Sequence, residues 1–428
     1  MKYRPPHKRW SRRSMLQLTG AGLLLPFGHS SIAHADEIDQ NLHEGPFWLT
    51  IHCSGGYDPT LLCDPKGITD ENDPAPINSY FTDEITEVGP FLVPPVEGHV
   101  DFFTRFQNDL LVINGIDTGT NSHETGTRTI WSGGMEANRP SLAALIAAAK
   151  SPRPSLAYLS TGGYDRTSDL VPVTRLPSTD TIQGLAYPER LTATDPESLF
   201  LHNSINSKIT AARAARLDRL AAAARLPREM DAIDILQSVS SNNSELARLV
   251  DFLPSDISSD NLQRDVQVAM ACFSAGVTIS ANLSIGGFDT HDNHDASHTP
   301  QLQSVLSAVA FAMDEAERLG IADKLYIIVG SDFARTPYYN DGNGKDHWPI
   351  TSMMMMGPQI QGGRVVGATD PDQLALTVDP QSLEQSSSGI YITPGHVHAA
   401  LRELAGILND PITSGFSVED LLPIMGSA

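Results

Sequence analysis

The chain is poor in cysteine and, after its first residues, has no long apolar run. Three cysteines in 428 residues exclude a disulfide-rich scaffold. No later segment contains 18 consecutive apolar residues, so no transmembrane helix is expected there. The sequence also lacks a Gly-x-Gly-x-x-Gly motif after its first predicted strand and any Cys-x-x-Cys pair. Both absences argue against an oxidoreductase with a bound organic cofactor.

Basic residues are scarce outside the amino-terminal segment. Residues 1–35 contain six of the 29 basic residues and none of the 51 acidic ones, so the remainder has 23 basic residues and a formal charge of −28. This charge argues against general electrostatic binding to nucleic acid or to anionic membranes. It favours a soluble protein, and clusters of carboxylates can bind hard cations.

The first 35 residues have the pattern of a secretory signal peptide. Arg12 and Arg13 follow a basic start, a short apolar stretch runs from Leu16 to Phe27, and residues 33–35 read Ala-His-Ala. Paired arginines are typical of twin-arginine signals, which direct folded proteins to the periplasm or beyond. The alternative is a membrane anchor, but the stretch is shorter than the roughly 20 residues that span a bilayer. We therefore expect the twin-arginine translocase as a partner during export, and one mature domain over residues 36–428.

An oxidising compartment permits a disulfide, and Cys53 with Cys63 is the local candidate. Geometry can also forbid this bridge, because Cys53 ends a predicted buried strand. Cys272 lies in a helical segment and is interpreted as a small buried apolar residue. The run Met353–Met356 is likewise interpreted as core packing rather than as a metal or redox site.

Continuous apolar strands alternate with amphipathic helices along the chain, which predicts an α/β fold with a mostly parallel sheet flanked by helices on both faces. The predicted strands cover residues 47–53, 109–115, 277–285, 324–329 and 351–356. Residues 121–132 are predicted as a loop that runs into a helix, and the other principal predicted helices cover residues 204–226, 242–253, 263–275, 302–319 and 397–408. In such folds, ligands bind beyond the carboxyl ends of the strands, so polar residues that follow strands are the candidates for a site.

The loop after the strand that ends at Ile285 is rich in metal-binding side chains. It opens with two glycines and contains Asp289, His291, Asp292 and His294. Carboxylates with imidazoles suit zinc, manganese or iron. A polar, solvated loop is the alternative interpretation.

Two more clusters lie beside predicted strands. Asp332 follows the strand that ends at Val329, and Arg335, three residues later, could bind a phosphate or sulfate group. The alternative for this pair is a helix cap with a structural salt bridge. His347 follows Asp346 just before the methionine strand and could be a metal ligand oriented by a carboxylate.

These clusters together resemble the exported family called "domain of unknown function 1501". The resemblance covers roughly residues 47–410 and rests on motifs in a fixed order: Gly-Phe-Asp-Thr-His at 287–291, Ser-Asp-Phe-Ala-Arg-Thr-Pro at 331–337, Asp-His-Trp-Pro at 346–349, and Gly-Gly-Arg-Val-Val-Gly-Ala-Thr-Asp at 362–370. That family is similar to the alkaline phosphatase and sulfatase superfamily. The resemblance implies an alkaline phosphatase-like fold and a two-metal site.

The resemblance also implies roles for individual residues. The metal ligands that it implies are Asp58, Asp289, His291, His294, Asp332 and His347. Phe333 stands where the superfamily has a further histidine ligand. The superfamily's nucleophile position falls on His123, with Ser122 and Thr125 beside it, so His123 could be a ligand or a nucleophile and Ser122 could be an activated alkoxide.

Two functions remain open at the level of the sequence. The first is a metal-dependent hydrolase of phosphate or sulfate esters, with zinc, manganese, iron or calcium, catalytic Ser122 or His123, and Arg335 binding the anionic ester. The second is a non-catalytic exported binding or assembly protein with a degenerate hydrolase-like site. Metal-dependent hydrolysis that is lost on changing Asp332 or His347 would distinguish the two.

Overall fold

The computed structural model describes residues 42–426, apart from 73, 151–155, 176–181, 184–185, 188, 193–194, 227–228, 231–232 and 234–242. The predicted signal peptide lies outside the described residues. Within the described ranges, no helix combines the length and the apolar character that crossing a bilayer requires.

The chain divides into two compact units. The larger consists of Glu37–Leu176 and Phe252–Ala428, and the smaller includes Pro177–Asp251. In the smaller unit, α7 (Asn203–Ala223) contains no buried residue, and α9 (Asn243–Phe252) follows it. That one mature domain covers residues 36–428 stays a prediction.

The larger unit is built on an eight-stranded sheet with the order β12-β4-β11-β8-β1-β7-β5-β6. Seven strands run in one direction and β11 runs opposite to them. The strand bounds are β1 Phe47–Cys53, β4 Leu111–Asp117, β5 Tyr158–Ser160, β6 Val173–Arg175, β7 Ser280–Ile285, β8 Leu325–Ser331, β11 Ile350–Met356 and β12 Arg364–Val366. The small pairs are β2 (Thr86–Val88) with β3 (Phe91–Val93), and β9 (Ala334–Arg335) with β10 (His347–Trp348).

The central strands are apolar without alternation because both of their faces are covered. Every residue of β1, β8 and β11 is buried. Met353–Met356 are at most 3 % exposed, which confirms their interpretation as core residues. Cys53, Cys63 and Cys272 are buried and free, so Cys53 and Cys63 form no disulfide in this structure.

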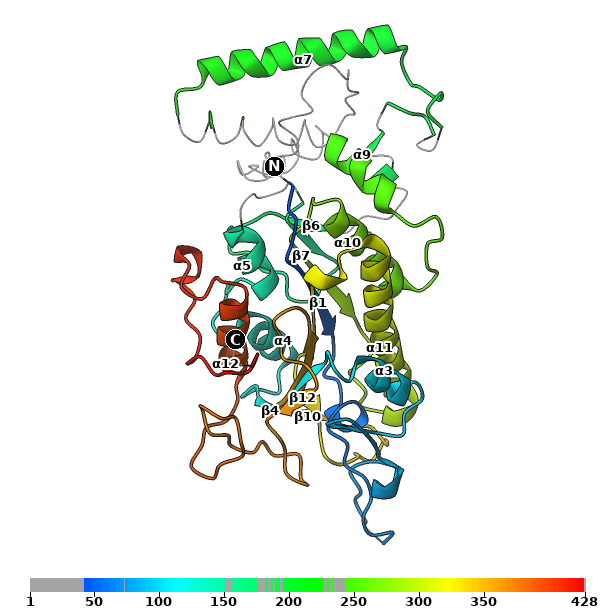
Figure 1. Ribbon diagram of the computed structural model, residues 1–428, viewed down its shortest axis with the longest axis vertical. Coiled ribbons are helices and arrows are strands. Elements are labelled where there is room, and N and C mark those ends of the chain that lie inside the picture. The colour runs from blue at the N-terminus through cyan, green and yellow to red at the C-terminus, as the bar shows by residue number, and fades with distance from the viewer. Residues whose placement is uncertain are drawn as a thin grey trace, which may run out of the picture. The chain divides into compact units, whose positions relative to one another are not determined.

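Helices pack on both faces of the sheet, as Figure 1 shows for α4, α5 and α12 on one side and α3, α10 and α11 on the other. The bounds are α3 His99–Phe106, α4 His123–Ser132, α5 Leu142–Ala149, α10 Asn261–Ser274, α11 His294–Leu319 and α12 Pro394–Leu404, with short 3-10 turns at Pro59–Leu61, Thr82–Glu84, Ala322–Lys324 and Pro411–Thr413. The predicted α/β class with a mostly parallel sheet is confirmed.

One helix starts much earlier than the sequence predicts. Helix α11 begins at His294 rather than near residue 302, and Pro300 lies inside it, in the second turn. Proline disfavours a helix interior, which is why the sequence pattern indicates a later start. The earlier start places His294 and His298 on the first turns of a helix instead of in a loop.

Candidate metal centre

The predicted site residues gather at one edge of the sheet. Because β1, β4, β7 and β8 are parallel, their carboxyl ends lie at a shared edge, and the amino end of the antiparallel β11 joins them there. The segments that follow or precede these ends carry the predicted residues Asp58, His123, Asp289, His291, Asp332 and His347.

Three imidazoles surround one carboxylate oxygen. The Nε2 atoms of His123, His291 and His347 lie 3.4, 3.0 and 3.3 Å from Oδ1 of Asp289. The Nε2 atoms of His291 and His347 are 3.1 Å apart. Ligand atoms of His123, Asp289 and His347 all lie within 4.8 Å of one another, a spacing that one metal ion could bridge. The structure therefore brings these four residues into one cluster.

The other ring nitrogen of each histidine contacts an acceptor that fixes its orientation. Nδ1 lies 2.6 Å from Asp332 in His123, 2.7 Å from Asp346 in His291 and 2.8 Å from the carbonyl oxygen of Asn121 in His347. A carboxylate or carbonyl oxygen accepts a hydrogen bond from Nδ1–H, so in the neutral ring the lone pair is on Nε2. All three Nε2 lone pairs are thus directed toward the same point, as in histidine metal sites whose ligands are oriented by outer partners.

Close packing of two loops brings His291 and His347 together. Gly344 approaches the backbone of His291 so closely that a Cβ atom at this position would lie 1.8 Å from the carbonyl oxygen of His291. Asn340 donates from Nδ2 to the same carbonyl oxygen at 2.9 Å. A side chain at position 344 would therefore separate the loop that carries His347 from the loop that carries His291.

Asp332 lies behind His123, away from the point on which the three Nε2 atoms converge. It is buried, accepts a hydrogen bond from the Gly55 amide at 3.2 Å and raises the pKa of His123 through its hydrogen bond to that ring. His52 Nε2 lies 3.2 Å from its other oxygen. Trp131 Nε1 lies 2.8 Å from His52 Nδ1 and can only donate, so His52 Nδ1 accepts this hydrogen bond. The proton of His52 is therefore on Nε2, which faces Asp332.

Phe333 forms an apolar floor under the cluster. Its ring is fully buried, with its centroid 4.8 Å from that of His123 and 4.5 Å from that of His347. The residue cannot bind a metal, as the sequence indicates, but it restricts the tilt of two rings that can.

All hydrogen bonds that the structure shows for the Arg335 guanidinium are to groups of the protein. This buried guanidinium donates to the carbonyl oxygens of Gly55, Gly56 and Lys345 and, at 2.7 Å, to Oδ1 of Asp289. Burial raises the pKa of Asp289, but the hydrogen bond and charge of Arg335, together with His123 and His347, outweigh that effect and lower the pKa to about 2. In this arrangement Arg335 positions Asp289, and the guanidinium does not face an open anion site.

Asp58 and His294 lie in a second, fully buried network. Oδ2 of Asp58 is 2.6 Å from Nζ of Lys345 and 3.0 Å from Nε2 of His294. Burial raises the pKa of Asp58, but the charge of Lys345 together with His294 and His298 outweighs it, and the net shift is downward. The structure does not bring these two predicted ligands to the three-histidine cluster. A lysine ammonium occupies the position next to Asp58 where a metal ion was expected.

Hydrogen bonds fix the proton positions in this second network. His298 Nε2 accepts from the Asp58 amide at 2.8 Å, so its proton is on Nδ1 and faces the Thr290 hydroxyl at 3.0 Å. The hydroxyl then donates to Nδ1 of His294 at 2.7 Å, which leaves the His294 proton on Nε2 for Asp58. The network is therefore internally satisfied without a metal ion.

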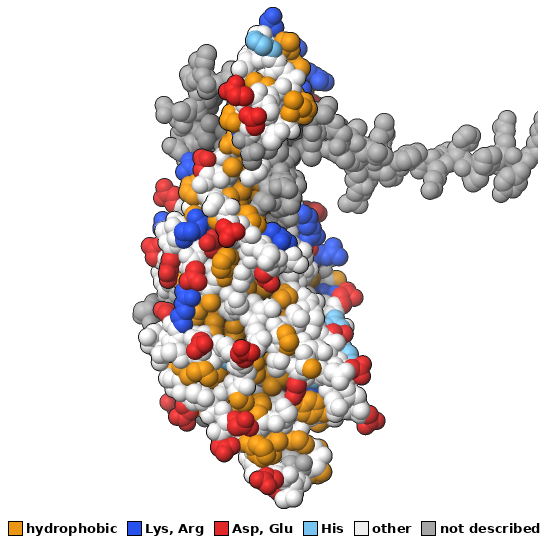
Figure 2. All heavy atoms as spheres, turned by 90° about the vertical axis from the view of Figure 1, so that its right-hand side faces the viewer, with side chains coloured by type: hydrophobic (Ala, Val, Ile, Leu, Met, Phe, Trp, Pro, Cys, Tyr) orange, Lys and Arg blue, Asp and Glu red, His pale blue; other side chains and the backbone are white. Residues whose placement is uncertain are grey.

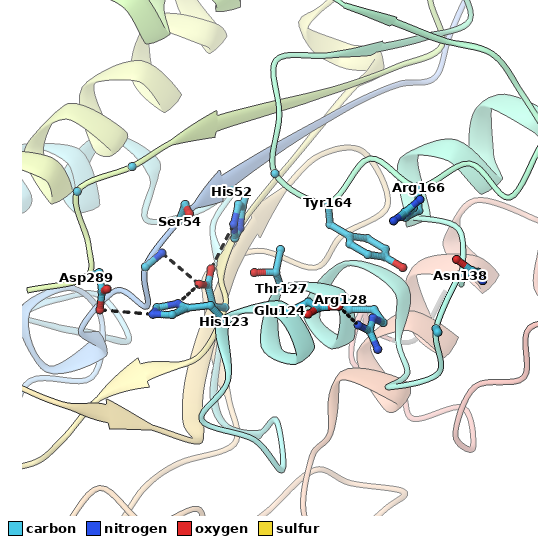
Figure 3. Close-up of a pocket in the computed structure, with 16 residues that line it drawn as sticks. His52, Ser54, His123, Glu124, Thr127, Arg128, Asn138, Tyr164, Arg166 and Asp289 are labelled. Carbon is cyan, nitrogen blue, oxygen red and sulfur yellow. Dashed lines mark hydrogen bonds and ion pairs between the residues drawn. The ribbon is translucent and has the colours of Figure 1, made fainter. Parts of the chain in front are cut away.

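Ser122 is the exposed residue immediately before α4, and its side chain makes no capping hydrogen bond. Its role as a nucleophile stays a prediction. A cavity of about 690 Å³ opens beside the cluster and is lined by, among others, His52, His123, Asp289 and Asp332. Figure 3 shows His123 and Asp289 at one side of this cavity.

Comparisons with known proteins support the predicted family. The sequence profile described as "Protein of unknown function (DUF1501)" matches residues 202–415. The chain belongs to this family. A search of curated protein sequences gave no match.

Several solved structures are similar to this DUF1501 protein at low identity. The PsFucS1 sulfatase of Pseudoalteromonas sp. has a TM-score of 0.41 and 9 % identity, with 90 % of this chain and 72 % of that chain covered. A putative sulfatase of Bacteroides thetaiotaomicron has a TM-score of 0.38 and 10 % identity, with 90 % of this chain and 76 % of that chain covered. TAB5 alkaline phosphatase (a His 135 Glu mutant with Mg bound) has a TM-score of 0.31 and 10 % identity, with 76 % of this chain and 95 % of that chain covered.

The sequence motifs of this DUF1501 protein also contain residues whose roles sequence reasoning missed. Lys345 and Asp346 directly precede His347 in the sequence. Lys345 neutralises the charge of Asp58, and Asp346 orients His291. His52 lies inside an apolar strand, where nothing in the sequence marks it as a partner of Asp332. The sequence predicted a carboxylate that orients His347, but Asp346 contacts His291 instead, and the carbonyl oxygen of Asn121 contacts Nδ1 of His347.

Proposed function

We propose that this protein is a metal-dependent hydrolase of phosphate or sulfate esters, with His123, His291, His347 and Asp289 as its metal-binding group. The observation that carries the proposal is the convergence of three Nε2 atoms on Asp289 Oδ1, with each Nδ1 facing an acceptor. Solvated histidines have no reason to share one orientation and one target, whereas histidine ligands of a single ion do.

The donor set fits a transition metal. Three imidazole nitrogens and one carboxylate oxygen suit zinc, manganese or iron, whereas calcium prefers oxygen ligands. The Nε2 atom of His123 is buried and has no hydrogen-bond partner among the described residues, as expected for a ligand atom without its ion. A divalent cation in this position would act as a Lewis acid toward an ester oxygen.

The surrounding residues have definable tasks. Asp332 and Asp346 keep two of the rings in the orientation that directs Nε2 toward the cluster, and Arg335 keeps the Asp289 carboxylate ionised and in place. The cavity beside His123 gives an ester access to the cluster, and the Thr127 side chain also lines it. Phe333 excludes water from beneath the two rings that it contacts.

A non-catalytic binding protein is the second candidate. The observation that favours it is the engagement of Arg335 with three carbonyl oxygens and Asp289, because this removes the predicted anion-binding guanidinium from the cavity. Such a protein would retain the metal but hydrolyse no ester.

Elemental analysis of the mature protein, purified without chelators, tests the metal centre. We expect close to one zinc, manganese or iron per chain, and its loss in His347→Ala. Asp332→Asn should keep the fold and weaken metal affinity about 10–100-fold, because Asp332 orients a ligand. His202→Ala, an exposed histidine in the smaller unit, is the matched control and should bind metal like the wild type.

The same proteins then distinguish the two candidate functions. Metal-dependent hydrolysis of aryl phosphates or sulfates, retained in His202→Ala and lost in His347→Ala, would support the hydrolase. A stoichiometric metal with no hydrolysis across a broad ester panel would favour the binding protein. A wild-type protein without metal would contradict the proposal as a whole.

We also propose export to the periplasm or beyond by the twin-arginine route. The paired arginines, the short apolar stretch and the Ala-His-Ala sequence support this localisation. A metal-binding group that is assembled from three separate chain segments is compatible with a route that transports folded proteins.

A further inference from the structure

The cavity beside the three-histidine cluster continues well past it. Its lining also includes Arg128, Asn138, Tyr164 and Arg166. Figure 3 shows these four residues on the opposite side of the cavity from Asp289 and His123. A volume of about 690 Å³ exceeds what a single phosphate or sulfate group needs and falls in the range of pockets for small organic molecules.

The loop that carries Tyr164 and Arg166 has a fixed position. It follows β5, so it leaves the sheet at the same edge as the metal centre. Asn282 of β7 donates from Nδ2 to the carbonyl oxygens of Gly162 and Tyr164, at 2.7 and 3.3 Å. The Tyr164 hydroxyl donates to the carbonyl oxygen of Arg139 at 2.6 Å.

The backbone of this loop also packs against the site. Gly163 has a φ of +68°, and a Cβ atom there would lie 2.9 Å from the His52 ring. These contacts, together with the hydrogen bonds from Asn282, fix the backbone of the loop that carries Arg166, whose exposed side chain lines the cavity.

The far end of the cavity is cationic, although the protein as a whole is acidic. The guanidinium of Arg166 makes no hydrogen bond or ion pair with any residue that the structure describes. Arg128 donates to Met135 O and pairs with Glu124 at 2.8 Å, but the Glu124 side chain is 87 % exposed and water screens its charge. The two arginines and the one carboxylate leave a net positive charge.

Acidic side chains are spread over other parts of the surface, as Figure 2 shows for one face. The formal net charge of the protein is −22, so its overall electrostatic field repels anions. An unpaired arginine on a fixed loop beside the cavity is a local feature, and a guanidinium is well suited to carboxylate, phosphate or sulfate groups.

We propose that this end of the cavity is a subsite for a second anionic group, so that the substrate is an ester whose alcohol part carries a further carboxylate, phosphate or sulfate. This inference rests on the proposed hydrolase function for the identity of the first anionic group. Arg166 is the principal contact of the second group and Arg128 assists it. The two groups bind at opposite sides of the cavity, so their spacing in the molecule determines the affinity.

Equilibrium binding of stable analogues tests the subsite without relying on turnover. The probes are alkylene bisphosphonates and disulfonates with three, five or seven carbons, each compared with the alkyl monophosphonate or monosulfonate of the same length. Calorimetry on the metal-loaded protein should show that one spacing binds at least about tenfold more tightly than its singly charged counterpart. Arg166→Gln should remove about tenfold of that affinity and leave the singly charged probe unaffected.

The controls separate this inference from the proposed function. Arg216→Gln, an exposed arginine on α7 that does not line the cavity, should bind every probe like the wild type. Equal affinities for singly and doubly charged probes at every length would overturn the subsite, as would an Arg166→Gln variant with unchanged preference. Metal content and ester hydrolysis are measured on the same samples, so a metal-loaded, active enzyme with no preference contradicts the subsite alone. A metal-free protein contradicts the proposed function.

Discussion

At the scale of single residues, two aspartates of similar sequence context have opposite surroundings. Asp289 is half exposed beside three imidazoles and a guanidinium, in a position where a metal ion can reach it. Asp58 is fully buried and paired with Lys345, which supplies the positive charge that a metal ion would otherwise supply. A carboxylate after a strand is therefore not sufficient to indicate a ligand. The nearest cation decides its role.

The Asp58–Lys345 pair leads to a prediction about stability. Asp58→Asn removes the negative charge and leaves a buried ammonium without its partner, which should lower the free energy of unfolding by about 3–5 kcal/mol. The folded fraction of the variant should still contain the metal, because the three-histidine cluster does not include Asp58. Urea denaturation and elemental analysis measure the two effects.

A double variant provides the control for that result. Asp58→Asn combined with Lys345→Met removes both charges and should recover part of the lost stability. Loss of the metal in folded Asp58→Asn would show instead that Asp58 is a ligand, as the family resemblance implies.

At the scale of elements, α12 packs on α4, the helix that begins with His123, through a buried histidine. His398 Nε2 lies 2.8 Å from the carbonyl oxygen of Ile130. Burial and the neighbouring Arg402 lower the pKa of His398 to about 3. The ring is therefore neutral in the folded protein at neutral pH and donates one hydrogen bond across the helix pair.

This depressed pKa predicts acid destabilisation with a definite sign. The unfolded chain protonates His398 near pH 6.5, whereas the folded protein resists protonation down to about pH 3. Between these values the unfolded state binds more protons, so stability falls as the pH falls, by at most about 1.4 kcal/mol per pH unit. Urea unfolding of wild type and His398→Gln from pH 7 to 4 should show a shallower loss in the variant. Parallel pH profiles for the two proteins would contradict the assignment.

At the scale of the whole molecule, one sheet edge combines segments that are far apart in the sequence. His123, Asp289 and Asp332 follow the parallel strands β4, β7 and β8, and His347 precedes the antiparallel β11, so all four residues lie at one sheet edge. A site of this kind forms only in the folded chain, which is consistent with the proposed export in folded form.

Export itself gives a prediction about the whole chain. Changing both Arg12 and Arg13 to Lys should retain the precursor in the cytoplasm, because the twin-arginine route requires the paired arginines. Cell fractionation with immunoblotting of the mature and precursor forms measures the effect. Lys8→Arg is the control, since it keeps the basic start and should be exported normally. Unchanged periplasmic protein in the double variant would argue for a different export route.

The sequence by itself determined the family, the α/β class and the three histidines of the proposed metal centre. Those features are local: apolar runs mark strands, and histidines or carboxylates next to strand ends mark a site. The family prediction was confirmed by the profile match, and the α/β class with a mostly parallel sheet was confirmed by the observed sheet.

Only the tertiary structure decided which carboxylates can meet a metal ion. It placed Asp289 among three imidazoles, Asp332 behind His123, and Asp58 next to a buried lysine from 287 positions away in the chain. It also turned Arg335 toward backbone carbonyls and left the Arg166 guanidinium beside the cavity without a partner among the described residues. The physical reason is that charge and hydrogen-bond partners of a buried group come from whichever segments the sheet order brings together, and a linear pattern does not contain that order.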